Sequence, residues 1–141
     1  MTDDVTRLSF VCVQNAGRSQ MSTAFAERER DRRGLEDEVE IVTGGTDPAE
    51  AVHDGVIETM TEIGIDLSDR EPREISTAQL NECDLVATMG CSTLELDADV
   101  EVRDWALTDP DGQDPEGVRA IREQVEANVR ELFDELFGTD A

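Results

Sequence analysis

Short apolar runs alternate with longer amphipathic stretches along this chain, and this alternation limits the folds that it can adopt. Four runs predict β-strands, at Leu8–Val13, Val39–Thr43, Asp84–Met89 and Val100–Ala106. Four stretches predict helices, at Arg18–Arg33, from Asp47-Pro48 through Ile63, at Ser76–Glu82 and at Pro115–Phe137. Such alternation favours a parallel sheet with helices on both faces. Because no repeat or linker interrupts the pattern, we expect one α/β domain over residues 1–141.

The chain is strongly acidic, and its charge limits the partners that it can bind. It has 35 Asp and Glu residues against 12 Arg and no Lys, for a net charge of −23. Strong acidity can indicate disorder, but the periodic apolar runs favour a folded domain. Concentrated cations would screen the self-repulsion, since the Debye length falls to about 3 Å at 1 M salt. We therefore expect a salt-adapted, halophilic protein, with no nucleic acid and no membrane as partner.

No segment resembles a signal peptide or a membrane-spanning helix. Residues Met1–Thr6 include two Asp, and no apolar run approaches the roughly 18 residues that a membrane helix needs. The three cysteines, an odd number, fit reduced thiols better than a disulfide framework. These features predict a cytoplasmic protein.

The loop between the first predicted strand and the first predicted helix has the features of an anion site. Ligands of open α/β sheets bind beyond the carboxyl ends of the strands, where Cys12–Arg18 lies. The small residues Ala16 and Gly17 let backbone N–H groups turn inward, and the following helix N-terminus attracts anions. Arg18 adds a guanidinium that suits tetrahedral oxyanions. The expected oxyanion-binding residues are Val13, Gln14, Asn15, Ala16, Gly17, Arg18 and Ser19.

The same surroundings would activate the Cys12 thiol. A thiol beside a helix N-terminus and an arginine has a lowered pKa, often roughly 3.5–7.5. The resulting thiolate is a nucleophile that could attack an anion held by the loop. Ser19 could donate a hydrogen bond to the sulfur, and Asn15 could hold the shape of the loop. The alternative is a buried structural cysteine with a surface arginine.

Three segments resemble the low-molecular-weight protein tyrosine phosphatase superfamily, and especially its arsenate reductase branch. They are FVCVQNAGRSQM (residues 10–21), TGGTDPAEAVHDGVIETMTEIGIDLSD (43–69) and VRDWALTDPDG (102–112). The resemblance implies a four-stranded parallel sheet of order 2-1-3-4 in a flavodoxin-like winding. It also implies that Cys12 is the catalytic nucleophile, that Arg18 binds the oxyanion and that Asp109 is the general acid. From the residues alone, Asp109 is more simply a turn residue.

Two features favour the reduction of arsenate over the hydrolysis of a phosphoester. The chain has no tyrosine, and Asp111-Gly112 follows Asp109-Pro110, where the phosphatases carry aromatic rings that hold phosphotyrosine. Cys91 follows the third strand, which lies beside the first in the implied order. A reductase needs a second thiol to attack the cysteine–arsenic adduct, so we expect Cys91 to take that role. The alternative for Cys91 is a small buried side chain.

The source of the reducing electrons stays open. No cysteine follows Cys91, whereas the thioredoxin-coupled reductases carry two resolving cysteines in this loop. The expected reductant is a thioredoxin-like or glutaredoxin-like protein or a small thiol. Cys83 precedes the third strand, too far from Cys91 for a disulfide, and is expected to be structural. Two alternatives to the reductase remain: a low-molecular-weight phosphatase that acts through a phosphocysteine, and a non-catalytic oxyanion or redox sensor.

No cofactor and no metal are expected. The single histidine, His53, lies near the start of a predicted helix and cannot form a metal site by itself. Some relatives bind potassium near the loop, and Asn15 matches one such position, but the sequence predicts no potassium site. Trp105 is expected to pack at the end of the fourth strand.

Overall fold

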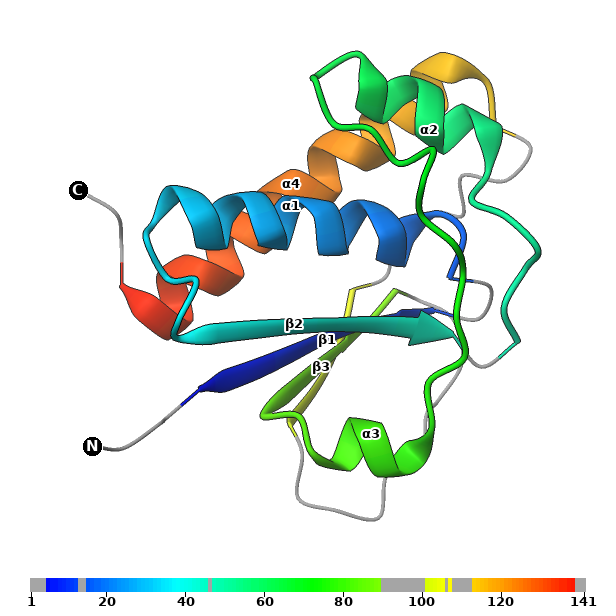
Figure 1. Cartoon of the computed structure of the whole chain (residues 1–141). Helices are drawn as coiled ribbons and strands as arrows, with labels where there is room; N and C mark the ends of the chain where they lie inside the picture. Colours follow the sequence, from blue (N-terminus) through cyan, green and yellow to red (C-terminus); the bar gives the residue numbers. More distant parts are fainter. Residues whose placement is uncertain are drawn as a thin grey trace.

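The computed structural model describes residues 5–12, 15–45, 47–89, 101–105, 107 and 113–138, and its elements form three layers (Figure 1). The strands are β1 (Thr6–Cys12), β2 (Val39–Gly45), β3 (Leu85–Thr88) and β4 (Glu101–Asp104). The helices are α1 (Arg18–Arg32), α2 (Asp54–Thr61), α3 (Thr77–Asn81) and α4 (Pro115–Phe137). Helices α1, α2 and α4 cover one face of the sheet, and α3 covers the other. The predicted α/β class is confirmed.

The four strands form one parallel sheet in the order β2-β1-β3-β4. This order confirms the 2-1-3-4 arrangement that the family resemblance implies. The carboxyl ends of β1 and β3 are neighbours, because Val11 pairs with Thr88. Cys12 is the last residue of β1 and pairs with Gly45 of β2. The thiol therefore lies at the edge of the sheet where open α/β folds bind ligands.

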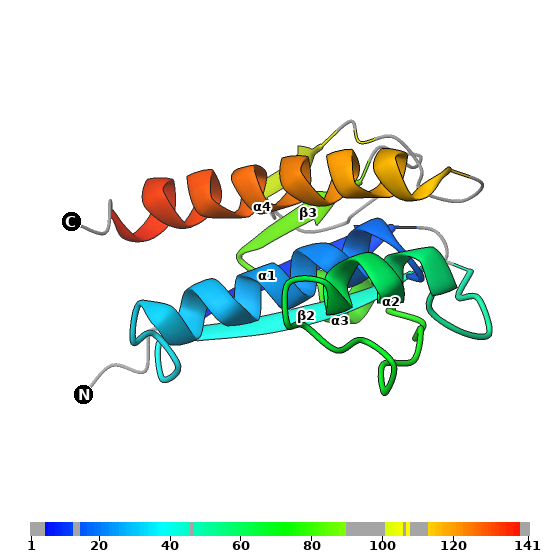
Figure 2. The ribbon, with the colours of Figure 1, turned by 90° about the horizontal axis from the view of Figure 1, so that it is seen from above.

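Helices α1 and α4 lie side by side over the sheet (Figure 2). The three- and four-residue spacing of apolar positions in α4 gives it one buried face. That face consists of Val118, Ile121, Val125, Val129, Leu132 and Phe133. It packs in the same core cluster as Phe10 of β1 and Met21 and Phe25 of α1. The core therefore fixes α1 and the end of β1, which includes Cys12.

Helix α2 begins later than the sequence predicts. A helix opening at Asp47-Pro48 was expected, but residues 47–53 are not helical and α2 starts at Asp54. The backbone N–H of His53 donates to the carbonyl oxygen of Ala16 at 2.9 Å, and Val52 is buried. These contacts hold the segment against the loop after β1 in a non-helical conformation. The prediction was wrong because tertiary contacts override local helix signals.

Strand β2 extends through the glycine pair that the sequence suggested would end it. The N–H of Gly45 donates to the carbonyl oxygen of Arg73 at 2.8 Å, and the N–H of Ile75 donates back to Gly45 at 3.2 Å. A Cβ on Gly44 would lie 2.4 Å from the Cβ of Ile75. Residues 73–75 can approach β2 this closely only because position 44 is glycine.

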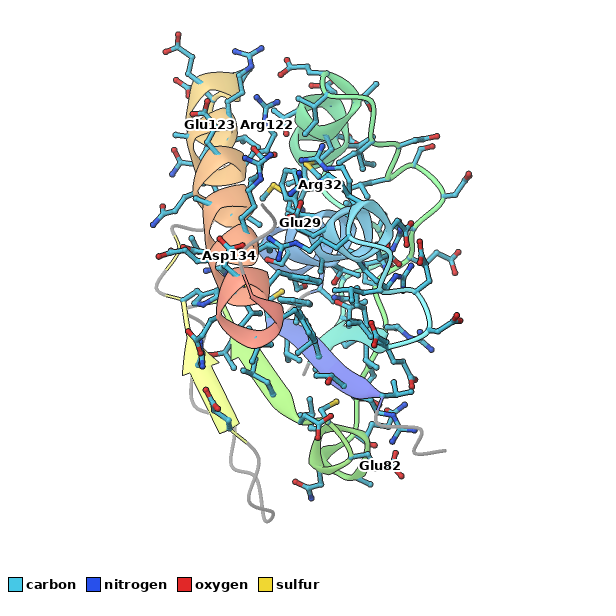
Figure 3. All side chains as sticks on the ribbon, turned by 90° about the vertical axis from the view of Figure 1, so that its left-hand side faces the viewer. Glu29, Arg32, Glu82, Arg122, Glu123 and Asp134 are labelled. Atoms are coloured by element: carbon cyan, nitrogen blue, oxygen red, sulfur yellow. The ribbon has the colours of Figure 1, made fainter. Side chains whose placement is uncertain are left out.

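Arg33 joins the C-terminal ends of α1 and α4 through two ion pairs, of which only the pair with Glu29 is buried. Arg33, which directly follows α1, pairs with Glu29 at 3.1 Å and with Asp134 at 2.7 Å. Figure 3 shows Glu29 and Asp134 where the two helix ends meet. Burial opposes the ionisation of Glu29, but hydrogen bonds from Arg32 and Arg33 lower the pKa of this carboxyl. Because the Arg33–Glu29 pair is buried, salt screens it less than it screens the surface charges.

Candidate active site

At the carboxyl end of β1, the Sγ atom of Cys12 contacts two described residues, Asn15 and Ser19. The backbone N–H of Asn15 donates to it at 3.1 Å, and the hydroxyl oxygen of Ser19 lies 2.9 Å away. The residue is 5% exposed. Donors that point at a sulfur stabilise its ionised form, so the N–H of Asn15 favours the thiolate, and the hydroxyl of Ser19 favours it when it donates.

The N-terminus of α1 lies beside this sulfur, because Ser19 belongs to its first turn. No side chain among the described residues caps the start of α1. By contrast, Ser76 caps α3 and Asp114 caps α4 through side-chain oxygens. An uncapped helix start has main-chain N–H groups available to an anion. The expected oxyanion site therefore has the helix terminus that it needs.

The carboxamide of Asn15 is held in one orientation. Its Oδ1 atom accepts from the backbone N–H of Arg73 at 3.0 Å and from Nε2 of Gln20 at 3.1 Å. Its Nδ2 atom donates to the hydroxyl oxygens of Ser19 at 2.8 Å and Thr43 at 2.9 Å. Two N–H donors facing one atom identify that atom as the oxygen. The hydroxyls of Ser19 and Thr43 must therefore accept from Nδ2.

This orientation leaves the hydroxyl hydrogen of Ser19 available to the Cys12 sulfur. The Ser19 oxygen accepts from Asn15, so the Ser19 hydroxyl hydrogen is available to the sulfur. A hydroxyl that donates to the sulfur stabilises the thiolate. The sequence predicted a donor role for Ser19 and a shape-holding role for Asn15; Ser19 lies within hydrogen-bond distance of the sulfur, and the side chain of Asn15 bonds to four neighbouring residues.

Two residues of this network were not foreseen from the sequence. Gln20 is 1% exposed and donates from Nε2 to both the main-chain oxygen and Oδ1 of Asn15, at 3.0 and 3.1 Å. Thr43 of β2 donates its hydroxyl to the carbonyl oxygen of Phe10 at 2.9 Å. Thr43 belongs to β2, so no local pattern marks its contact with Asn15. Gln20 lies only five residues after Asn15, but its residue type alone does not predict this contact.

Arg18 bridges the carboxyl ends of the strands. Its Nη1 atom donates to the carbonyl oxygen of Met89 at 2.6 Å and to that of Leu107 at 3.0 Å. Met89 directly follows β3, and Leu107 follows β4 by three residues. The guanidinium is half-buried and lies at the edge of the sheet where the sequence predicted an oxyanion clamp.

Four expected site residues, Val13, Gln14, Cys91 and Asp109, lie outside the described residues. In the chain, Cys91 follows Met89 by two residues and Asp109 follows Leu107 by two residues. Both segments therefore start from a carbonyl that Arg18 binds. The remaining loop residues, Ala16 and Gly17, are buried.

Cys83 lies at the opposite edge of the sheet from Cys12. It precedes β3, and the next residue, Asp84, donates its N–H to the carbonyl oxygen of Arg7 near the start of β1. Six strand residues span roughly 20 Å, which separates the two thiols beyond the reach of a disulfide. Burial raises the pKa of the Cys83 thiol. The position of Cys83 fits the structural role expected for it.

The other expectations concern metals, membranes and Trp105. Within the described ranges, no three His, Cys, Asp or Glu side chains come together as a possible metal site. No helix in that part of the chain is long and apolar enough to span a membrane. Trp105 packs against Phe10 with ring centroids 5.8 Å apart, as expected for the end of the fourth strand.

Comparisons with known proteins agree with this fold. The chain is 69% identical over 139 residues to a Halobacterium salinarum protein named "Putative arsenate reductase", and the match covers 98% of each chain. It is 31% identical to a "Glutaredoxin arsenate reductase" of Synechocystis sp., over 90% of this chain and 95% of the relative. A solved structure described as "An arsenate reductase in the phosphate binding state" is 28% identical with a TM-score of 0.79. That match covers 94% of this chain and 99% of the other.

The family model described as low molecular weight phosphotyrosine protein phosphatase matches residues 7–139. This range includes every strand and helix of the structure except the first residue of β1. It also includes Cys12, Arg18, Cys91 and Asp109. The chain belongs to the low molecular weight phosphotyrosine protein phosphatase family, and arsenate reductases are among its relatives.

Proposed function

We propose that this protein reduces arsenate to arsenite, with Cys12 as the nucleophile. The observation that carries the proposal is the position of the Cys12 sulfur, which the N–H of Asn15 and the hydroxyl of Ser19 both contact. The relatives named arsenate reductases support the choice of substrate. On this proposal the chain is one cytoplasmic domain over residues 1–141 that contributes to arsenical resistance.

In the first step, residues 13–19 and the guanidinium of Arg18 bind arsenate. The thiolate of Cys12 attacks arsenic and forms an S–As bond, and one arsenate oxygen leaves as water. Asp109 supplies a proton to that oxygen. The arsenic stays at oxidation state V in this step, because one ligand replaces another.

In the second step, a second thiolate attacks the sulfur of Cys12. An S–S bond forms, the S–As bond breaks, and its electron pair stays on arsenic, which leaves as arsenite at oxidation state III. The two sulfurs are oxidised to a disulfide, which balances the two electrons gained by arsenic. We assign the second thiol to Cys91 or to an external thiol. The contact between Arg18 and Met89 supports Cys91, because the chain from Met89 to Cys91 is only two residues long.

An external reductant then reopens the disulfide. We propose a thioredoxin-like or glutaredoxin-like protein or a small thiol, and the glutaredoxin in the name of the Synechocystis relative supports this class. The net charge of −23 argues against nucleic acid or an anionic membrane as a partner. It also supports salt adaptation, as does the relative from Halobacterium salinarum.

A second candidate function is hydrolysis of a phosphoester through a phosphocysteine. The match to the phosphatase family model favours it, because the same thiolate and guanidinium would serve phosphate equally well. The two activities differ after the first step, since water instead of a thiol would then resolve the adduct. A hydrolase would therefore need no thiol donor.

The test measures arsenite release in about 2 M salt with thioredoxin, glutaredoxin or a small thiol as donor. Wild type should release arsenite with at least one donor, and Cys12→Ser should release none. Cys91→Ser should slow release if Cys91 is the second thiol, while the matched control Cys83→Ser should keep the wild-type rate. Turnover of an aryl phosphate without arsenite would support the phosphatase instead. Arsenate binding without turnover by any donor would support a sensor.

A further inference from the structure

The side chain of Gln20 joins α1 to the turn that follows Cys12. Its Nε2 atom donates to the main-chain oxygen of Asn15 at 3.0 Å and to Oδ1 of the same residue at 3.1 Å. Gln20 is 1% exposed, and its Oε1 atom makes no hydrogen bond within the described part of the chain. Burying an amide whose oxygen has no hydrogen-bond partner costs free energy. We therefore expect the two bonds from Gln20 to Asn15 to serve a purpose that offsets this cost.

The benefit concerns the backbone of Asn15. This residue has φ of 52°, and among the described residues no other non-glycine residue has a positive φ. A left-handed residue persists where its surroundings hold it, even though asparagine tolerates this conformation better than most residues. Gln20 holds both ends of the residue, the main-chain oxygen and the side-chain oxygen. In this conformation the N–H of Asn15 donates to the sulfur of Cys12.

The same contact orients the donors around the sulfur. By donating to Oδ1, Gln20 helps to turn Nδ2 of Asn15 toward the hydroxyl of Ser19. That hydroxyl lies 2.9 Å from the Cys12 sulfur and can donate to it once the sulfur is ionised. Gln20 therefore acts on the N–H of Asn15 and on the hydroxyl of Ser19, two described groups that contact the sulfur.

We propose that Gln20 is a positioning residue for the reaction, which holds Asn15 in the left-handed conformation that directs two hydrogen-bond donors at Cys12. This inference rests on the proposed function, because it assigns to Gln20 the task of keeping the nucleophile ionised. The proposal predicts that loss of the Gln20 Nε2 donor raises the pKa of the Cys12 thiol, even though Gln20 lies in α1 and not in the loop.

The test follows the pH dependence of Cys12 alkylation by iodoacetamide, read by mass spectrometry of the Cys12 peptide in about 2 M salt. Gln20→Met keeps an unbranched side chain of similar length and removes the donor. Its alkylation midpoint should rise by about one pH unit, which is about a 10-fold loss of thiolate at pH values below the wild-type midpoint. If Gln20→Met does not fold, Gln20→Glu serves instead, because it also removes the donor and places a carboxylate oxygen against Asn15.

Two further variants separate positioning from packing. Thr59→Val removes a buried hydroxyl in α2 that, among the described residues, bonds to Val56 of its own helix, so it should lower stability and leave the midpoint unchanged. In an Asn15→Gly background, glycine adopts a positive φ without help. Gln20→Met should therefore shift the midpoint much less there than in the wild-type background.

The outcomes distinguish the inference from the function on which it rests. A wild-type midpoint at the value of an ordinary thiol would overturn the proposed function and the role of Gln20 together. A low wild-type midpoint that survives Gln20→Met would overturn only the role of Gln20. Equal shifts in the wild-type and Asn15→Gly backgrounds would also overturn it, because Gln20 would then act by another route.

Discussion

The Nη1 atom of Arg18 lies 2.6 Å from the carbonyl oxygen of Met89, the residue that directly follows β3. The same nitrogen binds the carbonyl oxygen of Leu107 at 3.0 Å. Cys91 and Asp109 follow these two residues by two positions each. One guanidinium thus connects the proposed oxyanion site to the starts of the two segments that carry the proposed second thiol and general acid.

Substitution of Arg18 by lysine should remove this connection while keeping the positive charge. A single ammonium cannot hold two carbonyls and also present a planar fork to an oxyanion. Loss of one oxyanion donor typically costs about 100- to 1,000-fold in rate, so kcat/KM for arsenate should fall by that order in Arg18→Lys. Arsenate should also protect Cys12 from alkylation less well.

The matched control for this substitution is Arg122→Lys. Arg122 also donates from Nη1 to a carbonyl, that of Thr59 at 2.7 Å, but it joins α2 to α4. The kcat/KM of Arg122→Lys for arsenate should stay within a few-fold of wild type. Equal losses in the two variants would mean that Arg18 matters only for stability.

Substitution of Ser19 by alanine should raise the pKa of the Cys12 thiol. The hydroxyl of Ser19 lies 2.9 Å from the sulfur, and loss of a donor to a charged group destabilises the charged form. The alkylation midpoint of Cys12 should therefore move to higher pH, by about one unit. Ser22→Ala is the matched control, because Ser22 is also buried on α1 but donates to the main-chain oxygen of Arg18. If the alkylation midpoint is the same in Ser19→Ala and Ser22→Ala, Ser19 does not lower the pKa of Cys12.

The sequence predicted the sheet and its helices well because their signals are local. Apolar spacing alone identified α4 from Pro115 to Phe137, and the alternation of elements identified a parallel sheet. The start of α2 was missed because it depends on a bond between His53 and Ala16, 37 residues apart in sequence. The extension of β2 was missed because it depends on the pairing of Gly45 with the chain at Arg73 and Ile75.

In the candidate site, as in the fold, the sequence predicted what is local and missed contacts between distant segments. Cys12, Asn15 and Ser19 lie within one loop and the first turn of its helix, so their neighbourhood is visible in the sequence. The contributions of Thr43 and the backbone of Arg73 to Asn15 come from segments that only the folded chain brings together. A single sequence carries no local signal for such contacts.

Activity should rise with salt between about 0.1 M and about 2 M KCl. The net charge of −23 makes the folded chain repel itself and repel an anionic substrate, and salt screens both effects. The measurement is kcat/KM for arsenate across this range together with the midpoint of thermal unfolding. Sucrose at matched osmolality is the control, because it adds no ions. Activity that falls steadily with KCl would contradict salt adaptation.

Substitution of Gly44 by alanine should destabilise the fold. The new Cβ would lie 2.4 Å from the Cβ of Ile75, an atom that cannot move without its backbone. Overpacking of this kind costs about 1–3 kcal/mol in the free energy of unfolding. Gly55→Ala is the control, since its Cβ would meet only Val118 at 3.9 Å and Gly55 lies in α2. Denaturant unfolding should show that Gly55→Ala is stabilised by roughly 0.5–1 kcal/mol. A Gly44→Ala variant as stable as wild type would contradict the close approach of Ile75 to position 44.

The ionised side chain of Glu62 should stabilise the folded chain near neutral pH and lose this effect in acid. Hydrogen bonds from Arg119 and Arg122 lower the pKa of Glu62 from 4.5 to about 2 in the folded chain. The ionised carboxylate therefore stabilises the folded state above pH 4.5, and this contribution is lost as the pH falls toward about 2. Glu62→Gln should accordingly lower the midpoint of thermal unfolding near pH 7, with a difference from wild type that shrinks as the pH falls through this range.

The comparison uses the lowest salt at which the protein folds, because Glu62 is solvent-exposed and salt weakens its pairs. Glu58→Gln is the matched control, because Glu58 is an exposed carboxyl on the same helix with no ion pair to a described residue. Its unfolding midpoint should follow the wild-type pH curve. A Glu62→Gln difference that stays constant from pH 7 down to pH 2 would show that the side chain stabilises the contact between α2 and α4 by packing, not by its charge.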